Sequence, residues 1–154
     1  MKWNFTQMTQ NQAEDIAYNW HYDGEYSFYD IQADEEDFQE FIDPGLRGES
    51  FYVVEDNGEL IGFFNFTGKQ ANTIEVGLGM RPDLTGKGIG LGFIEAGIEF
   101  AESNYCPDKL TLSVAIFNQR AIKVYKKAGF KEMDTFMQDT NGSRYEFVRM
   151  EMDV

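Results

Sequence analysis

Three glycines at alternate positions, Gly86, Gly88 and Gly90, precede apolar residues at helical spacing in the interval 88–104. Glycine allows backbone conformations that other residues avoid, and it lets the main chain approach a ligand closely. The first turn of a helix also presents unpaired N–H groups and the positive end of the helix dipole. The spacing therefore predicts a loop and a helix start that together bind an anion, and phosphate is the expected guest.

Two better-known phosphate-binding patterns do not fit this segment. In a P-loop, the first glycine would stand at Arg81, and a serine or threonine would follow Lys87 where this chain has Gly88. The dinucleotide pattern Gly-x-Gly-x-x-Gly would require glycine at Leu91 or at Phe93, depending on the frame. The spacing thus disfavours both a nucleoside triphosphatase and a Rossmann-type enzyme.

Charge is distributed unevenly along the sequence. The formal net charge of −14 at neutral pH disfavours nucleic acids and anionic membranes as partners. Residues 81–131, which contain the glycine segment, carry a net charge of +3, whereas residues 1–80 carry −13 and residues 132–154 carry −4. An anionic ligand at the glycine segment and a cationic acceptor elsewhere would fit this distribution. Solubility alone would also account for the acidic N-terminal half.

Length and cysteine content suit one reduced domain. At 154 residues the chain has the size of a single domain, 1–154. Cys106 is the only cysteine, so no internal disulfide can form, and no cysteine and histidine set at zinc spacing accompanies it. No apolar run follows Lys2, and no stretch of about eighteen apolar residues occurs. We therefore expect a metal-free cytoplasmic protein.

Turn and cap signals divide the chain into strands and helices. Thr9 with Gln12 forms a capping box at the start of a first helix, and Asp34 begins a second, short helix. The Asn-Gly pairs at 57–58 and 141–142 each predict a hairpin. We expect strands at residues 3–8, 51–54, 60–64, 73–80, 110–116, 130–138 and 144–152, and helices at 9–20, from 34, at 88–104 and at 118–128.

The last expected helix completes a pair of motifs. It begins with the N-cap residue Asn118, carries a single tyrosine, Tyr125, and ends before Gly129. Together with the glycine segment at 80–92, it resembles the GNAT superfamily of acyl-CoA-dependent N-acetyltransferases. The motifs match well over residues 74–130, and the element order β-α-α-β-β-β-α-β-α-β-β is that of the GNAT fold. The resemblance implies an α/β fold with one mixed, mostly antiparallel sheet of about seven strands and about four helices.

The resemblance implies acetyl-CoA as cosubstrate, held largely by main-chain N–H groups. Where the family's loop has glutamine or arginine, this chain has Thr85, so one side-chain contact differs while the main-chain cradle is retained. Lys87 and Arg81 would add charge to the phosphates or would be solvated loop cations. Asn118 is either an N-cap only or also a cofactor contact. The main-chain positions implied for pantetheine are Leu78, Gly79 and Met80, and those implied for the pyrophosphate are Gly86, Lys87, Gly88, Ile89, Gly90 and Leu91.

Acetyl transfer to an amine requires a neutral amine, a polarised carbonyl and a proton donor for the leaving thiolate. A thiol has a pKa of about 8.5 and a phenol of about 10, so a tyrosine is protonated at neutral pH and can donate to the departing sulfur. Tyr125 matches the family's tyrosine in this role, and the alternative is a tyrosine that only packs on the sheet. We expect a bulge at Gly77 and Gly79 to turn a backbone N–H toward the carbonyl.

The general base is left open by the sequence. Glu75 lies on the strand that leads to the glycine segment, close to where several family members carry a catalytic glutamate, and we predict it as the base, directly or through water. The glutamate that other members carry on the next strand corresponds here to Ser113, which cannot serve. The only histidine, His21, titrates in the useful range, and packing is the alternative role for it.

Residues 20–30 interleave aromatic and acidic side chains. Aromatic faces attract a cation, and carboxylates pair with it, so this surface suits an amine. In the GNAT fold this connection commonly walls the acceptor site. The residues predicted on this basis to bind the substrate are Trp20, Tyr22, Tyr26 and Tyr29. The alternative is that these rings only seal the first two helices onto the sheet.

We therefore predict an N-acetyltransferase that moves an acetyl group from acetyl-CoA to a primary amine by direct attack, with a small cationic metabolite as the leading acceptor. Protein amines, either N-terminal or lysine, are the second class of acceptor. A non-catalytic acyl-CoA-binding sensor is the alternative from another class. We expect no metal, nucleic acid or membrane as a partner, and a homodimer is left open together with the identity of the acceptor.

Overall fold

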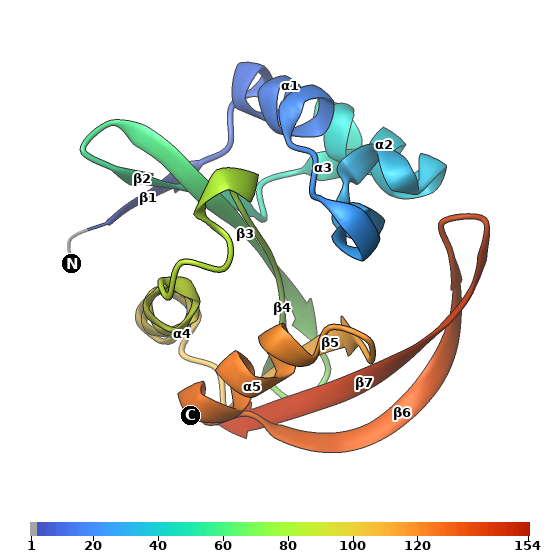
Figure 1. Cartoon of the computed structure of the whole chain (residues 1–154). Helices are drawn as coiled ribbons and strands as arrows, with labels where there is room; N and C mark the ends of the chain where they lie inside the picture. The colour runs from blue at the N-terminus through green and yellow to red at the C-terminus, as the bar shows by residue number, and fades with distance from the viewer. Residues whose placement is uncertain (1–2) are drawn as a thin grey trace.

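The computed structural model describes residues 3–154, which form one seven-stranded sheet with helices on both faces (Figure 1). The strand order is β1-β2-β3-β4-β5-β7-β6, and each neighbouring pair is antiparallel except β4 and β5. The strands are β1 Asn4–Gln7, β2 Phe51–Asp56, β3 Glu59–Lys69, β4 Thr73–Met80, β5 Lys109–Ala115, β6 Lys131–Thr140 and β7 Ser143–Asp153. The helices are α1 Gln10–Asn19, α2 Glu35–Ile42, α3 Pro44–Arg47, α4 Gly90–Tyr105 and α5 Gln119–Ala128, with 3₁₀ turns η1 Gly24–Tyr29, η2 Ile31–Ala33 and η3 Pro82–Leu84. The predicted architecture is confirmed.

Local signals account for most of these elements. The capping box predicted at Thr9 is present at the start of α1. In both Asn-Gly turns the two central residues have positive φ, 51° and 83° at 57–58 and 53° and 76° at 141–142, as a two-residue hairpin turn requires. The strand predicted at 60–64 is longer than expected, because β3 continues along β4 to Lys69.

Alternation along β3 sends neighbouring side chains to opposite faces of the sheet. Phe63 packs with Trp20 of the α1 end and with Phe41 of α2, while Phe64 packs with Phe93 of α4. Figure 1 shows α1, α2 and α3 on one side of the sheet and α4 and α5 on the other. The two faces therefore have separate hydrophobic clusters.

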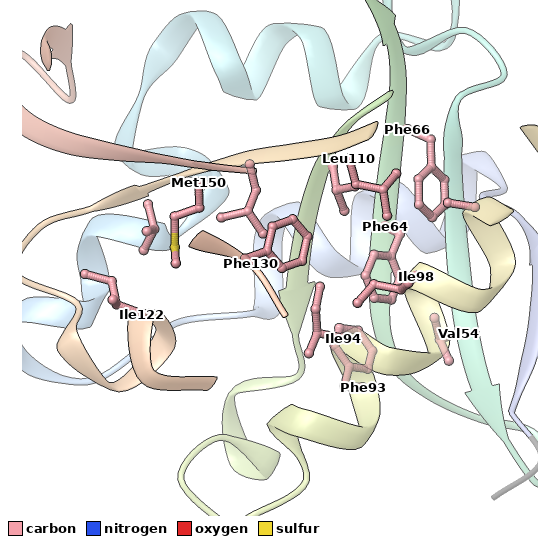
Figure 2. Close-up of a cluster of buried hydrophobic side chains, with 14 of the residues drawn as sticks. Val54, Phe64, Phe66, Phe93, Ile94, Ile98, Leu110, Ile122, Phe130 and Met150 are labelled. Atoms are coloured by element: carbon pink, nitrogen blue, oxygen red, sulfur yellow. The ribbon is translucent and has the colours of Figure 1, made fainter. Parts of the chain in front are cut away.

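The larger cluster joins the sheet to α4 and α5. Figure 2 shows Phe64, Phe93 and Leu110 at one end of this cluster and Ile122 of α5 at the other, with Phe130 between them. The rings of Phe64 and Phe93 are stacked, with centroids 4.6 Å apart. Complete burial of such a side chain contributes about 1.5–3 kcal/mol, so this cluster fixes both helices on the sheet.

Gly97 lets α4 approach the Phe64 ring closely. A Cβ at position 97 would lie 2.3 Å from that ring, so Gly97→Ala is expected to lower the free energy of unfolding by about 1–3 kcal/mol through overpacking. Denaturant unfolding followed by circular dichroism measures the loss. Gly68→Ala in β3 is the control, because a Cβ there would meet no atom within 4 Å. Equal stability of the two variants would contradict the close packing.

Two neighbouring strands separate in the middle of the sheet. The parallel pairing of β4 with β5 covers only Thr73 to Glu75, so the rest of β4 is paired on its β3 side alone. The predicted bulge at Gly77 and Gly79 is absent, because the register of β3 with β4 is continuous from Lys69↔Thr73 to Gly62↔Met80. The strands themselves diverge instead, and this exposes the β4 backbone beyond Glu75.

Candidate active site

A cavity of about 590 Å³ lies beside the part of β4 that has left β5. Its walls come from α1, from the segment that holds η1 and η2, and from strands β3 and β4. The loop at residues 85–89, called the glycine loop, and helices α4 and α5 complete them. The residues that line it are Ile16, Trp20, Tyr22, Tyr26, Tyr29, Ile31, Phe63, Leu78, Gly79, Met80, Thr85, Gly86, Gly88, Gly90, Leu91, Phe93, Asn118, Arg120, Ala121, Val124, Tyr125 and Lys127. Most residues of the predicted cofactor, catalytic and substrate sites therefore share one cavity.

The glycine loop forms one end of this cavity. Gly86 and Gly88 have φ values of +72° and +80°, so α4 begins at Gly90 rather than at Gly88 as predicted. Ile89, at the N-cap of α4, has no side chain that can accept from the first-turn amides. These N–H groups remain available to a ligand, and helix N-termini of this kind bind phosphate. The loop therefore fits the diphosphate of acetyl-CoA.

The cations that line the cavity differ from those predicted. Arg81 does not line the cavity. Its Nε donates to Asp83 Oδ1 at 2.6 Å, and its Nη1 donates to the Leu60 carbonyl oxygen. Lys87 is exposed, and neither it nor Ile89 contributes to the lining. The positive side chains that line the cavity are instead Arg120 and Lys127.

Arg120 and Lys127 were not predicted as cavity residues, because the family motif marks other positions of this segment, Asn118 and Tyr125. Together with Val124 they follow helical spacing along the cavity side of this helix. The side chain of Arg120 reaches toward the glycine loop, since a Cβ on Gly86 would lie 3.3 Å from Nη1. Its guanidinium also lies over the Tyr26 ring, 4.4 Å from the centroid. Arg120 thus lies where the glycine loop meets the group of cavity-lining rings at Trp20, Tyr22, Tyr26 and Tyr29, called the aromatic wall.

Tyr125 contributes to the cavity wall from the middle of α5, as the resemblance implied. Its ring packs against Phe130, with centroids 6.3 Å apart. Burial raises the pKa of the Tyr125 phenol above its ordinary value, so the hydroxyl stays protonated at neutral pH. A protonated phenol beside a cavity can donate to a leaving group, and this role of Tyr125 stays a prediction.

Asn118 caps α5, and its contact with the cofactor stays a prediction. Its Oδ1 accepts from the Ala121 amide at 3.2 Å and so caps α5. Its Nδ2 donates to the Tyr29 hydroxyl at 3.2 Å, and the residue lines the cavity. The cap therefore ties the first turn of α5 to the aromatic wall.

The aromatic wall brings together the predicted substrate-binding residues Trp20, Tyr22, Tyr26 and Tyr29. The Tyr22 hydroxyl donates to the Met80 carbonyl oxygen at 2.6 Å and fixes the wall to the end of β4. Burial raises the pKa of Tyr22. Trp20 is also buried in the cluster under α1 and α2, so this ring both seals the helices and faces the cavity.

The two candidate bases, Glu75 and His21, are not among the residues that line the cavity. The Glu75 carboxylate pairs with Lys69, 3.5 Å away, in the part of β4 that still pairs with β5, and its side chain is 44% exposed. His21 contacts the Asp30 carboxylate at 3.0 Å and the Tyr18 carbonyl oxygen at 2.8 Å. The hydrogen bond to Asp30 raises the pKa of His21. The lining within residues 3–154 contains no carboxylate and no histidine.

Comparison with known proteins places the chain among acetyltransferases. Residues 14–130 match the model of the acetyltransferase (GNAT) family. A mycothiol acetyltransferase of Amycolatopsis mediterranei is 29% identical over 133 residues, which cover 79% of this chain and 42% of that protein. An N-alpha-acetyltransferase of Sulfurisphaera tokodaii is 29% identical over 96 residues, covering 54% of this chain and 58% of that protein. The chain thus spans less than half the length of the mycothiol acetyltransferases that it matches.

Solved structures show the same fold at low sequence identity. The spermidine N-acetyltransferase of Vibrio cholerae in complex with CoA and spermine has a TM-score of 0.74 and 18% identity, covering 98% of this chain and 95% of that one. No helix within residues 3–154 is long and apolar enough to cross a membrane. The same residues contain no group of three or more His, Cys, Asp or Glu side chains that could hold a metal ion.

Proposed function

Because the chain belongs to the GNAT acetyltransferase family, we propose that it transfers an acetyl group from acetyl-CoA to a primary amine. The observation that carries the proposal is that one cavity joins the glycine loop to the Tyr125 phenol. At one end, free amides and Arg120 suit a diphosphate. The aromatic wall meets this end at Tyr26, whose ring lies against the Arg120 guanidinium, and we propose that it holds the acceptor beside the cosubstrate.

The residues of this chain would bind the cosubstrate mainly through their backbone. The segment Leu78 to Met80 has left the β5 ladder and would pair with pantetheine on that side, where the Met80 carbonyl oxygen already accepts from the Tyr22 hydroxyl. The loop amides and the first turn of α4 would hold the diphosphate, and Lys127 would add positive charge. Acetyl-CoA supplies the activated thioester carbonyl when bound.

We propose direct attack without an acyl-enzyme. The neutral amine forms the C–N bond as the C–S bond breaks, the Tyr125 phenol protonates the departing thiolate, and water takes the proton that the amine loses. Solvent then reprotonates the tyrosinate. Water replaces the predicted base Glu75, because that carboxylate is paired with Lys69 away from the cavity.

A small cationic amine is the acceptor that we favour. The faces of the wall tyrosines can hold an ammonium group, and exposed Asp23 and Glu25 in the same segment would attract it. The fold shared with spermidine N-acetyltransferases supports this choice. Protein amines are the second candidate, because an N-alpha-acetyltransferase is among the relatives. We further propose a cytoplasmic enzyme without nucleic-acid or membrane partners, as a monomer or a homodimer.

Release of free thiol from acetyl-CoA tests the function directly. The expected result is amine-dependent release with spermidine, spermine or glucosamine, at a higher rate than with a peptide that has a free N-terminus or a lysine. Calorimetric titration with CoA is run in parallel. Binding of CoA without release for any amine would favour the sensor, and absence of CoA binding would overturn the proposal altogether.

A further inference from the structure

The tip of the β6–β7 hairpin is bonded to the segment that carries the aromatic wall. Two donors of the tip, the Asn141 amide and the Thr140 hydroxyl, bind Asp34 Oδ2 at 2.9 and 3.0 Å. The Asn141 side chain donates from Nδ2 to the Phe28 carbonyl oxygen at 2.9 Å. We call Asp34, Thr140 and Asn141 the clamp. Figure 1 shows this hairpin curving away from α5 toward α2.

Asp34 divides its two oxygens between two tasks. Oδ1 accepts from the Asp37 amide at 2.9 Å and caps α2, whereas Oδ2 faces the hairpin. Hydrogen bonds from the Asp37 and Asn141 amides lower the pKa of Asp34, so the carboxylate is ionised at neutral pH and accepts strongly. Capping of α2 accounts for the hydrogen bond to Oδ1 but not for those to Oδ2. The bonds to Oδ2 link residues that are more than a hundred positions apart.

The clamp is continuous with the aromatic wall through Phe28. The Phe28 ring packs edge-on against Tyr145 of the hairpin at 4.8 Å and against Phe117 at 5.4 Å. The cavity-lining residues Tyr26 and Tyr29 flank Phe28 in η1, and both rings also pack on Phe117. A shift of Phe28 would therefore move the two tyrosines.

We propose that the clamp positions the acceptor wall, so that it sets the affinity for the acceptor amine without touching it. The inference rests on the proposed function in placing the acceptor at Tyr26 and Tyr29. Folding of the hairpin does not need the clamp, because β6 and β7 pair without interruption from Asp134↔Arg149 to Thr140↔Ser143 around their own Asn-Gly turn. The clamp instead adds bonds to the segment of short 3₁₀ turns, η1 and η2, that carries the wall.

Asp34→Asn is expected to remove the bonds of the clamp while keeping the N-cap of α2. Asparagine keeps Oδ1 for the Asp37 amide and remains a good N-cap, but its NH₂ group cannot accept from Thr140 or Asn141. Asp43→Asn is the matched control, because Asp43 caps α3 through Oδ1 and the change removes the same charge.

Asn141→Gly changes the hairpin half of the clamp. It removes the hydrogen bond from the Asn141 side chain to the Phe28 carbonyl oxygen. Glycine tolerates the positive φ of this turn, so only the side chain is lost. Asn57→Gly makes the same change in the β2–β3 turn, which contributes nothing to the cavity lining.

Two measurements decide the proposal. In both clamp variants we expect amide hydrogen exchange in residues 24–33 to become about tenfold faster. For the panel amine with the highest rate, we expect KM to rise about three- to tenfold with CoA affinity unchanged. Both controls should match the wild type.

Exchange at the wild-type rate in both clamp variants would overturn the proposal. A rise in acceptor KM in the controls as well, or loss of CoA affinity along with acceptor affinity, would also overturn it, because a general loss of structure would then be the cause. Hydrogen exchange needs no turnover. If no amine is acetylated, the proposed function fails, and the exchange result alone decides whether the clamp holds the segment.

Discussion

Tyr125→Phe is expected to lower kcat by about 100-fold, the range found for acid–base residues, while the Kd for CoA changes by less than about twofold. Phenylalanine keeps the ring that packs against Phe130 and removes only the hydroxyl, which has no hydrogen-bond partner within residues 3–154. The fold and the cavity shape should therefore survive. Thiol release under saturating substrates gives kcat, and calorimetric titration gives the Kd.

A matched variant and a pH profile make this prediction specific. Tyr18→Phe removes a phenol from the exposed side of α1 and should leave kcat unchanged. An acid whose pKa is raised keeps its proton to higher pH, so no fall in kcat due to Tyr125 is expected below about pH 10. A wild-type kcat for Tyr125→Phe would remove this residue from the mechanism and return it to a packing role.

The parts of the fold that the sequence predicted are those that short segments decide. The Asn-Gly turns at 57–58 and 141–142 need positive φ, and the capping box at Thr9 is complete within four residues. The start of α4 was placed two residues early, because the φ values of Gly86 and Gly88 depend on the path of the loop. The separation of β4 from β5 is a property of the whole sheet, and no local pattern records it.

The site was predictable where main-chain or motif positions define it, and less so where side-chain direction does. Asn118 and Tyr125 follow from their motif and line the cavity. Glu75 lies outside the cavity lining, and this could not be predicted because its position depends on how far β4 stays paired with β5. Arg120 and Lys127 were not predicted, because each lies two positions from Asn118 or Tyr125, a spacing that puts residues on different sides of a helix, and only the path of α5 along the cavity brings both sides to it.

Gly88→Val is expected to weaken CoA binding by about 100-fold in a folded protein. Open space lies beside Gly88, with no protein atom within 4 Å of an added Cβ, so the side chain itself causes no clash. The added atoms would occupy the space through which the loop amides reach the diphosphate. Loss of two charge-assisted hydrogen bonds at about 1.5 kcal/mol each corresponds to this factor. Calorimetric titration with CoA measures it.

Backbone strain is the competing explanation, because valine is disfavoured at the φ of +80° found at Gly88. Gly58→Val isolates this effect, since Gly58 has a φ of +83°, equally open space, and a place in the β2–β3 turn outside the cavity. Both variants should lose similar stability in denaturant unfolding, and only Gly88→Val should lose CoA affinity. If the two bind CoA equally well, the glycine loop is only a turn that begins α4. If both bind weakly, strain accounts for the loss, and the diphosphate must be held elsewhere.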